Sequence, residues 1–178
     1  SRLMAGSFEC TVTGIDLSDE FIETATALTS MFFTAEQVCF HQGSILEMPF
    51  EDRSFDAVLC QHVLMNIADK DKVFQEFFRV LGSGGKLILH EIIRGDAGPL
   101  ILPVPWASKE EISFLEPLAT LQTLLETTGF EAEFCEDRTR ETINWYHKVK
   151  QFAAAGKGMP PKLGPHLIFG EQARQFPI

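Results

Sequence analysis

The strongest constraint on the fold of this chain is the alternation of short apolar segments with longer amphipathic ones in its first half. Strand-like composition recurs in four segments, residues 10–15, 38–41, 54–60 and 86–93. The segment 69–81 places its apolar residues at helical spacing. Strands that alternate with helices of ten or more residues form βαβ units, whose crossovers lay helices on both faces of a mainly parallel sheet. The sequence therefore predicts an α/β fold of the Rossmann-like, doubly wound kind.

Capping and turn residues set the expected ends of the helices. Ser18 fits an N-cap position and is followed by two acids, which favour the first turn of a helix. The glycines at 82, 84 and 85 are expected to stop the helix at 69–81. Further along, the pattern predicts a helix at 118–128, a strand near 131–135, an amphipathic segment at 141–155 and a turn-rich stretch at 156–165.

Composition narrows the class of protein. A chain of 178 residues with 45% hydrophobic content has enough apolar material for one packed core. The formal charge of −10 opposes binding to nucleic acid, because that affinity depends on cations that neutralise phosphates. No apolar run approaches a membrane span and no secretory signal is visible, which predicts a cytoplasmic protein with a small-molecule partner and no membrane contact. The four cysteines lack C-x-x-C spacing, so we expect neither a disulfide framework nor a metal site.

Asp16 is the first candidate binding residue. It follows the strand at 10–15 and precedes a helix, where doubly wound folds place an acid that accepts hydrogen bonds from both ribose hydroxyls of a nucleotide. Leu17 beside it is suited to pack on one face of an adenine. An acid in this position also caps the following helix in many proteins, and this reading is equally open.

Several short motifs occur in one order between residues 12 and 93. They are V-T-G-I-D-L-S at 12–18, G-S-I at 43–45, M-P-F at 48–50, S-F-D at 54–56, R-V-L at 79–81 and G-G-K-L at 84–87. In this order and spacing the chain resembles the class I S-adenosylmethionine-dependent methyltransferases. Within that family it is most similar to small-molecule enzymes of the ubiquinone/menaquinone, sarcosine and phosphoethanolamine kind.

The resemblance implies a site for S-adenosylmethionine. Asp16 would hold the ribose, Leu17 and Ile45 would enclose the adenine, and Cys60 and Gln61 would lie near the methionine portion. The methyl group would then point into the cleft beyond the carboxyl ends of the strands, where the acceptor must approach.

The chain departs from the family pattern in two respects. Ser44 stands where the family usually has an acid that accepts a hydrogen bond from the adenine amino group, so a neutral hydroxyl or the backbone is expected to serve there. The Gly-rich first motif has no counterpart, and the last strand of the family is unassigned. We therefore expect a fold that is incomplete at both ends, with residues 1–5 continuing the helix after the missing motif and with poor cofactor binding by this stretch alone.

The catalytic candidates are His62, His90 and Glu91, which end strands on the side of the sheet where the acceptor would approach. A general base is needed only if the acceptor is protonated at neutral pH. For the two histidines, a structural role satisfied by neighbouring backbone is an equal alternative. Substrate contacts are expected in the second half of the chain, from Trp106, Trp145, Tyr146 and His147. The loop that carries Trp106 suits a mobile cover, with packing as the equal alternative.

We therefore interpret residues 1–178 as a single domain, with a cofactor-binding part at 1–95 and a substrate-facing part at 96–178. The predicted function is methyl transfer from S-adenosylmethionine to a small-molecule acceptor, mainly by alignment and desolvation. Two alternatives stay open. One is an NAD-dependent oxidoreductase, since Asp16 suits the ribose of a nicotinamide dinucleotide equally well. The other is a non-catalytic binding domain on the same fold. A homodimer is also predicted.

Overall fold

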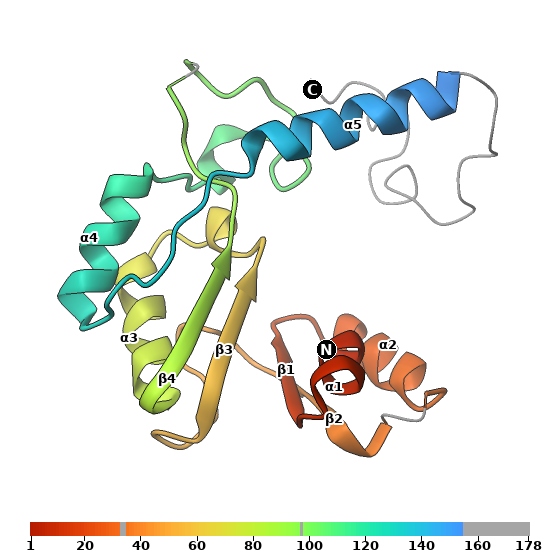
Figure 1. Cartoon of the computed structure of the whole chain (residues 1–178), viewed down its shortest axis with the longest axis vertical. Helices are drawn as coiled ribbons and strands as arrows, with labels where there is room; N and C mark the ends of the chain where they lie inside the picture. Colours follow the sequence, from red (N-terminus) through yellow and green to blue (C-terminus); the bar gives the residue numbers. More distant parts are fainter. Residues whose placement is uncertain (33–34, 97, 155–178) are drawn as a thin grey trace. The chain divides into compact units, whose positions relative to one another are not determined.

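The computed structural model describes residues 1–32, 35–96 and 98–154 (Figure 1). Their secondary structure alternates between strands and helices in the first half and is helical in the second half. The chain divides into two compact units. Unit 1 comprises Ser1–Val58 and Asp69–Ile88, and unit 2 comprises Leu59–Ala68 and the described residues from Leu89 onward.

Unit 1 begins with a parallel βαβ arrangement. Its elements are α1 (Arg2–Phe8), β1 (Val12–Asp16), α2 (Asp19–Thr29), the 3-10 turn η1 (Ala35–Gln37) and β2 (Val38–Gln42). Strands β1 and β2 pair in parallel, in a register that runs from Val12 opposite Val38 to Asp16 opposite Gln42. Both strands therefore end at the same edge, and the two predicted strands at 10–15 and 38–41 are confirmed.

Local chemistry explains where α2 begins. The Ser18 hydroxyl accepts a hydrogen bond from Phe21 N at 3.2 Å, as an N-cap side chain does. Asp19 and Glu20 occupy the first turn, where the helix dipole favours negative charge. The predicted cap is confirmed.

Helix α3 (Lys70–Val80) supplies the most deeply buried side chains of unit 1. Phe74 is 0% exposed and Phe77 is 2% exposed, so this face of the helix belongs to the core. Phe78 is 47% exposed and lies outside that face. It lies one position beyond Phe77, and a rotation of one residue moves a side chain out of the buried stripe of a helix.

The second strand pair consists of β3 (Phe55–Gln61) and β4 (Leu81–His90). Both strands point the same way in Figure 1. Near their starts Arg53 N donates to Arg79 O at 2.9 Å, and at their ends His62 N donates to His90 O at 3.0 Å. Strand β4 ends at His90 and not at residue 93 as predicted, and Glu91 therefore lies just past the strand end.

The glycines at 82, 84 and 85 belong to strand β4. Helix α3 ends at Val80 and β4 begins at the next residue, so the glycines lie inside β4. A Cβ atom on Gly85 would come within 2.9 Å of Gly82 O and 3.1 Å of Asp56 O. Only a residue without a side chain permits this close approach of backbone to backbone.

Unit 2 contains two 3-10 turns and two helices. These are η2 (Leu64–Asn66), η3 (Glu110–Ile112), α4 (Leu118–Thr128) and α5 (Thr139–Ala154). Helix α4 has the predicted bounds and is closed by Gly129 at a φ of 111°. Helix α5 corresponds to the predicted amphipathic segment, whereas residue 155 and the turn-rich stretch at 156–165 lie outside the described residues.

The strand predicted near 131–135 was wrong. These residues carry no strand ladder, and all five are exposed. Among the described residues no strand pairs with them, and β-prone composition does not hold a strand without a partner. The strands and helices that are present confirm the predicted α/β class. Within the described ranges, no helix combines the length and the apolarity that crossing a bilayer requires.

Candidate functional site

In unit 1 the candidate site is built at the shared edge where β1 and β2 end. Gly43 N donates to Asp16 O at 2.9 Å, and Gln42 Nε2 donates to Leu17 O at 3.2 Å. These two bonds join the segment after β1 to the segment after β2. They bring the predicted residues Asp16 and Leu17 beside the segment that carries Ser44.

Asp16 is exposed at the end of β1 and has two uses. Its Oδ1 accepts a hydrogen bond from Ser18 N at 2.9 Å, which fixes the turn into α2. In the described part of the chain no donor is bonded to Oδ2, which leaves one carboxylate oxygen and the further lone pair of Oδ1 for a ligand hydroxyl. The helix-capping reading and the ligand reading of Asp16 are thus compatible.

The segment after β2 forms a tight turn. Leu46 N donates to Ser44 Oγ at 3.1 Å, and Glu47 N donates to Ser44 O at 3.2 Å. The Ser44 hydroxyl retains its own proton as a donor and one lone pair as an acceptor. Ile45 is half-buried, whereas Leu17 is 71% exposed. An exposed leucine and a half-buried isoleucine beside a free carboxylate form a mixed surface that suits the flat, apolar base and the diol of a nucleoside.

In unit 2 a second cluster surrounds the Glu91 carboxylate. Glu91 accepts hydrogen bonds from Val63 N at 3.0 Å, from Leu64 N at 3.2 Å and from the Cys60 thiol at 3.2 Å. Cys60 is 6% exposed. Its burial, together with the negative charge and hydrogen bond of Glu91, raises the pKa of the Cys60 thiol far above its usual value. The thiol is therefore protonated at neutral pH. Both oxygens of Glu91 accept hydrogen bonds from the turn after β3 and hold it in place.

Two histidines meet beside this cluster. The rings of His62 and His90 lie with their centroids 4.7 Å apart and their planes inclined by 52°. Gln61 Nε2 lies 3.0 Å from His90 Nδ1, and because an amide nitrogen only donates, this ring nitrogen is the acceptor. His62 has a left-handed backbone with a φ of 55°, uncommon for a residue other than glycine. Both histidines are exposed, so a ligand can reach both rings.

The predicted substrate residues are not brought together in the described structure. Trp106 is half-buried, and its indole Nε1 donates to Ser113 Oγ at 3.1 Å, which ties it to its own loop. Trp145 lies on α5 and is 59% exposed. His147 is exposed on the same helix, and the side chain of Tyr146 lies outside the described residues. Their contact with a substrate stays a prediction.

Sequence patterns do not identify every contributor to the two clusters. Gln42 is one such residue, and its only sequence signal is an amide at the end of a strand beside a glycine. The backbone N–H groups of Val63 and Leu64 carry no sequence signal, because any residue but proline supplies one. No group of three or more His, Cys, Asp or Glu side chains within the described ranges is arranged to hold a metal ion.

A family model described as a methyltransferase domain matches residues 1–89, which is half of the 178 residues. This chain belongs to the methyltransferase domain family. The match includes β1, β2 and β3, and therefore the candidate site of unit 1 and the residues Cys60, Gln61 and His62 of unit 2.

Three known methyltransferases are similar to this chain in sequence or in structure. The O-methyltransferase cnsE of Penicillium expansum is 28% identical over 93% of this chain and 59% of its own length. The demethylmenaquinone methyltransferase of Lactiplantibacillus plantarum is 28% identical over 82% of this chain and 59% of its own length. A structure of Haemonchus contortus phosphoethanolamine N-methyltransferase 2, in complex with phosphomonomethylethanolamine and S-adenosylhomocysteine, covers 97% of this chain and 41% of that chain with a TM-score of 0.72 at 22% identity.

These findings confirm the predicted family and the predicted fold. The structural match at 22% identity supports the fold alone, and the demethylmenaquinone relative belongs to the small-molecule enzymes that the sequence resembles. The chain spans 59% of the length of each of the two sequence relatives. The oxidoreductase alternative receives no support from these comparisons.

Proposed function

We propose that this chain takes part in methyl transfer from S-adenosylmethionine to a small-molecule acceptor. The observation that carries the proposal is the junction between β1 and β2, where Gly43 N bonds to Asp16 O at 2.9 Å inside the region that matches the methyltransferase domain. The junction sets a carboxylate with a free oxygen next to apolar side chains and a hydroxyl. This donor and acceptor set fits the adenosine part of the cofactor.

Each candidate residue of the unit 1 site is then assigned a role. Asp16 accepts hydrogen bonds from the ribose hydroxyls, while its contact with Ser18 N keeps the carboxylate in place. Leu17 and Ile45 cover the two faces of the adenine. The Ser44 hydroxyl or its neighbouring backbone meets the edge of the base, in place of the acid that is usual in the family.

The cofactor, when bound, supplies a methyl group that is already activated on a sulfonium. Little covalent help is then required, and the contribution of the chain is to bind, to align and to exclude water. In unit 2 we assign Cys60 and Gln61 to the neighbourhood of the methionine portion, with the buried neutral Cys60 thiol as a packing group.

For an acceptor that carries a proton, His62 is the proposed base. Gln61 donates to His90 Nδ1, which places the single proton of the neutral His90 ring on Nε2, so in this arrangement His90 offers a hydrogen-bond donor. For His90 to act as a base, the Gln61 amide must first release Nδ1, and that role stays a prediction. Glu91 is proposed to position the turn after β3, because both of its oxygens already accept backbone N–H groups. A cytoplasmic location, a homodimer, the single-domain division at residue 95 and contacts from Trp106, Trp145, Tyr146 and His147 stay predictions.

A sequence relative and the charge of the chain indicate the acceptor class. Demethylmenaquinone, named in one relative, is a small metabolite, and the charge of −10 opposes a nucleic-acid acceptor. We therefore propose a small metabolite as the acceptor of the methyl group.

Isothermal titration of the full-length protein with S-adenosylhomocysteine tests the proposal, because poor binding is expected of the present stretch alone. Asp16→Ala should weaken binding at least tenfold, on the order of 1.4 kcal/mol. Asp16→Asn keeps an oxygen for Ser18 N but loses the charge, and so separates loss of the turn from loss of the ribose contact. Asp96→Ala, at an exposed aspartate of unit 2, is the matched control.

Micromolar binding that weakens in both Asp16 variants and not in the control supports the assignment. Absence of binding by the wild-type protein would refute it. Binding without methyl transfer to any small acceptor would favour the non-catalytic alternative.

A further inference from the structure

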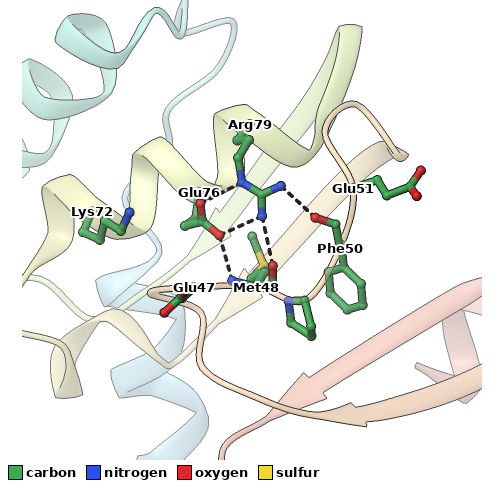
Figure 2. Close-up of a pocket in the computed structure, with 8 residues that line it drawn as sticks. Glu47, Met48, Phe50, Glu51, Lys72, Glu76 and Arg79 are labelled. Carbon is green, nitrogen blue, oxygen red and sulfur yellow. Dashed lines mark hydrogen bonds and ion pairs between the residues drawn. The ribbon is translucent and has the colours of Figure 1, made fainter.

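The Arg79 guanidinium is the centre of a dense hydrogen-bond network in unit 1 (Figure 2). Its Nε and one terminal nitrogen donate to the two oxygens of Glu76, each at 2.8 Å. The same terminal nitrogen donates to Met48 O at 3.0 Å, and the other donates to Phe50 O at 2.7 Å and to Asp52 Oδ1 at 2.9 Å. This planar fork is thus fully engaged by the protein.

Glu76 completes the network from the same face of α3. It lies one helical turn before Arg79 and is 7% exposed. Its Oε2 accepts a hydrogen bond from Met48 N at 2.7 Å. Hydrogen bonds from Arg79 hold the pKa of the Glu76 carboxyl below its usual value, although burial opposes the shift. The carboxylate is therefore charged at neutral pH, and it binds a backbone N–H that would otherwise be buried without a partner.

The network fastens the segment at 43–50 at its far end. Met48 is 7% exposed and bonds to α3 through both its N–H and its carbonyl group. The near end is fastened to β1, because Gly43 N donates to Asp16 O at 2.9 Å. The tight turn at Ser44 lies between these two anchors. The position of this turn is thus determined jointly by β1 and by α3.

An open hollow of about 670 Å³ lies at this network and is lined by residues of the same segment and of α3 (Figure 2). A ligand site for an anion would need cations with free donors and few acids around them. Lys72 lines the hollow as well as Arg79, but so do Glu47, Glu51 and Glu76, which give the lining three carboxylates against two cations. The Arg79 donors are already committed to Glu76, to two backbone carbonyls and to Asp52. The geometry therefore favours a role in holding the segment over a role in binding a ligand there.

We propose that Arg79 and Glu76 are positioning residues for the cofactor, which fix the segment at 43–50 and thereby the adenine contacts of Ser44 and Ile45. The inference rests on the proposed function, since it deepens the description of the same adenosine site. Neither residue touches the cofactor in this scheme. They hold the segment in one conformation before the cofactor binds, so that less conformational entropy is lost on binding.

Arg79→Lys is the decisive substitution, because lysine keeps the charge but offers one nitrogen in place of a five-donor fork. It leaves either a backbone carbonyl or a Glu76 oxygen without its donor. We expect the dissociation constants of S-adenosylhomocysteine and of adenosine to rise by the same factor, at least tenfold, because the segment faces the base and not the methionine. In hydrogen exchange, the Met48 amide should lose protection.

Two control variants isolate the effect. Asp52→Asn removes the charge of the outermost partner, whose side chain is 74% exposed, and leaves the bonds to Glu76, Met48 and Phe50. Arg138→Lys makes the same substitution at an exposed ion pair, 2.7 Å from Glu136. Both should change cofactor affinity less than twofold. Glu76→Gln, which keeps one oxygen for Met48 N, provides a milder variant should Arg79→Lys unfold.

All titrations are made under conditions in which urea unfolding shows each variant to be fully folded. If Arg79 only stabilised the fold, the affinity of the Arg79→Lys protein would then equal that of the wild-type protein. Equal affinity of wild-type and Arg79→Lys protein for both ligands would overturn the inference while leaving the proposed function intact. Equal protection of Met48 in both proteins would also overturn it. Failure of the wild-type protein to bind S-adenosylhomocysteine would instead refute the proposed function, and with it the positioning role.

Discussion

Replacement of Glu91 by glutamine tests whether this carboxylate holds the turn after β3. Both Glu91 oxygens accept a hydrogen bond from Val63 N, and Oε2 also accepts from Leu64 N. An amide has one oxygen, so its NH₂ group must face at least one of these backbone donors. An amide oxygen at the Oε2 position still accepts from both N–H groups, but as a neutral acceptor, and the NH₂ group at the Oε1 position then lies against Val63 N. A hydrogen bond to a charged acceptor contributes about 1.5–3 kcal/mol and one to a neutral acceptor about 0.5–1.5 kcal/mol, so each of the two bonds is weakened. We expect the free energy of unfolding to fall by about 2 kcal/mol.

Urea denaturation at neutral pH measures this change, and the thermal midpoint should fall by about 4–8 °C for a chain of this size. Glu131→Gln, at an exposed glutamate of the same unit, is the control. Equal stability of the two variants would refute the reasoning, because the carboxylate would then be dispensable to the turn. A stable Glu91→Gln protein that binds cofactor but transfers no methyl group would identify Glu91 as a base.

Three further predictions follow from burial and charge. Phe74→Ala should lower the free energy of unfolding by about 3–5 kcal/mol, because this side chain is 0% exposed, whereas Phe78→Ala should cost about 0.5 kcal/mol or less; similar losses in urea titrations would contradict the described core. The pKa of Glu76 is lower in the folded protein than its usual value of 4.5, so its contribution to stability is present above about pH 4.5 and is lost as the pH falls below it; a Glu76→Gln variant with the same acid-unfolding profile would argue against this. Cys60 should resist iodoacetamide at pH 8 while the exposed cysteines react, because its pKa is raised and it is 6% exposed; mass mapping that finds equal labelling would disprove the buried thiol.

The parts of the fold that could be predicted from the sequence are those determined by neighbouring residues. Short runs of β-prone, apolar residues predicted β1, β2 and β3, and the helical spacing of apolar residues predicted α3, whose buried residues follow that spacing. Ser18 predicted the start of α2 for the same local reason. Gly129 likewise ended α4 where expected, since a left-handed residue is required there.

Features that depend on distant partners could not be predicted in this way. The segment at 131–135 has strand-like composition, but whether it becomes a strand depends on a neighbour elsewhere in the chain. Arg79 was noticed only as part of a motif, and its bonds to Met48 O and Phe50 O involve backbone atoms that have no sequence signature. The hydrogen bonds that Glu91 accepts from Val63 N and Leu64 N could not be predicted either, because they also come from backbone atoms. For candidate sites, sequence identified the residues, and only geometry separated those with free atoms from those already in use.

The left-handed backbone of His62 limits which residues can occupy this position after β3. A φ of 55° is tolerated by glycine and, among side chains, mainly by asparagine, aspartate and histidine, whereas valine, isoleucine and threonine are strongly disfavoured. The side chains that the backbone admits most readily are therefore ones that accept or donate hydrogen bonds. The surface at the end of β3 is therefore biased towards polar side chains, and a wall of branched aliphatic side chains is disfavoured at this position.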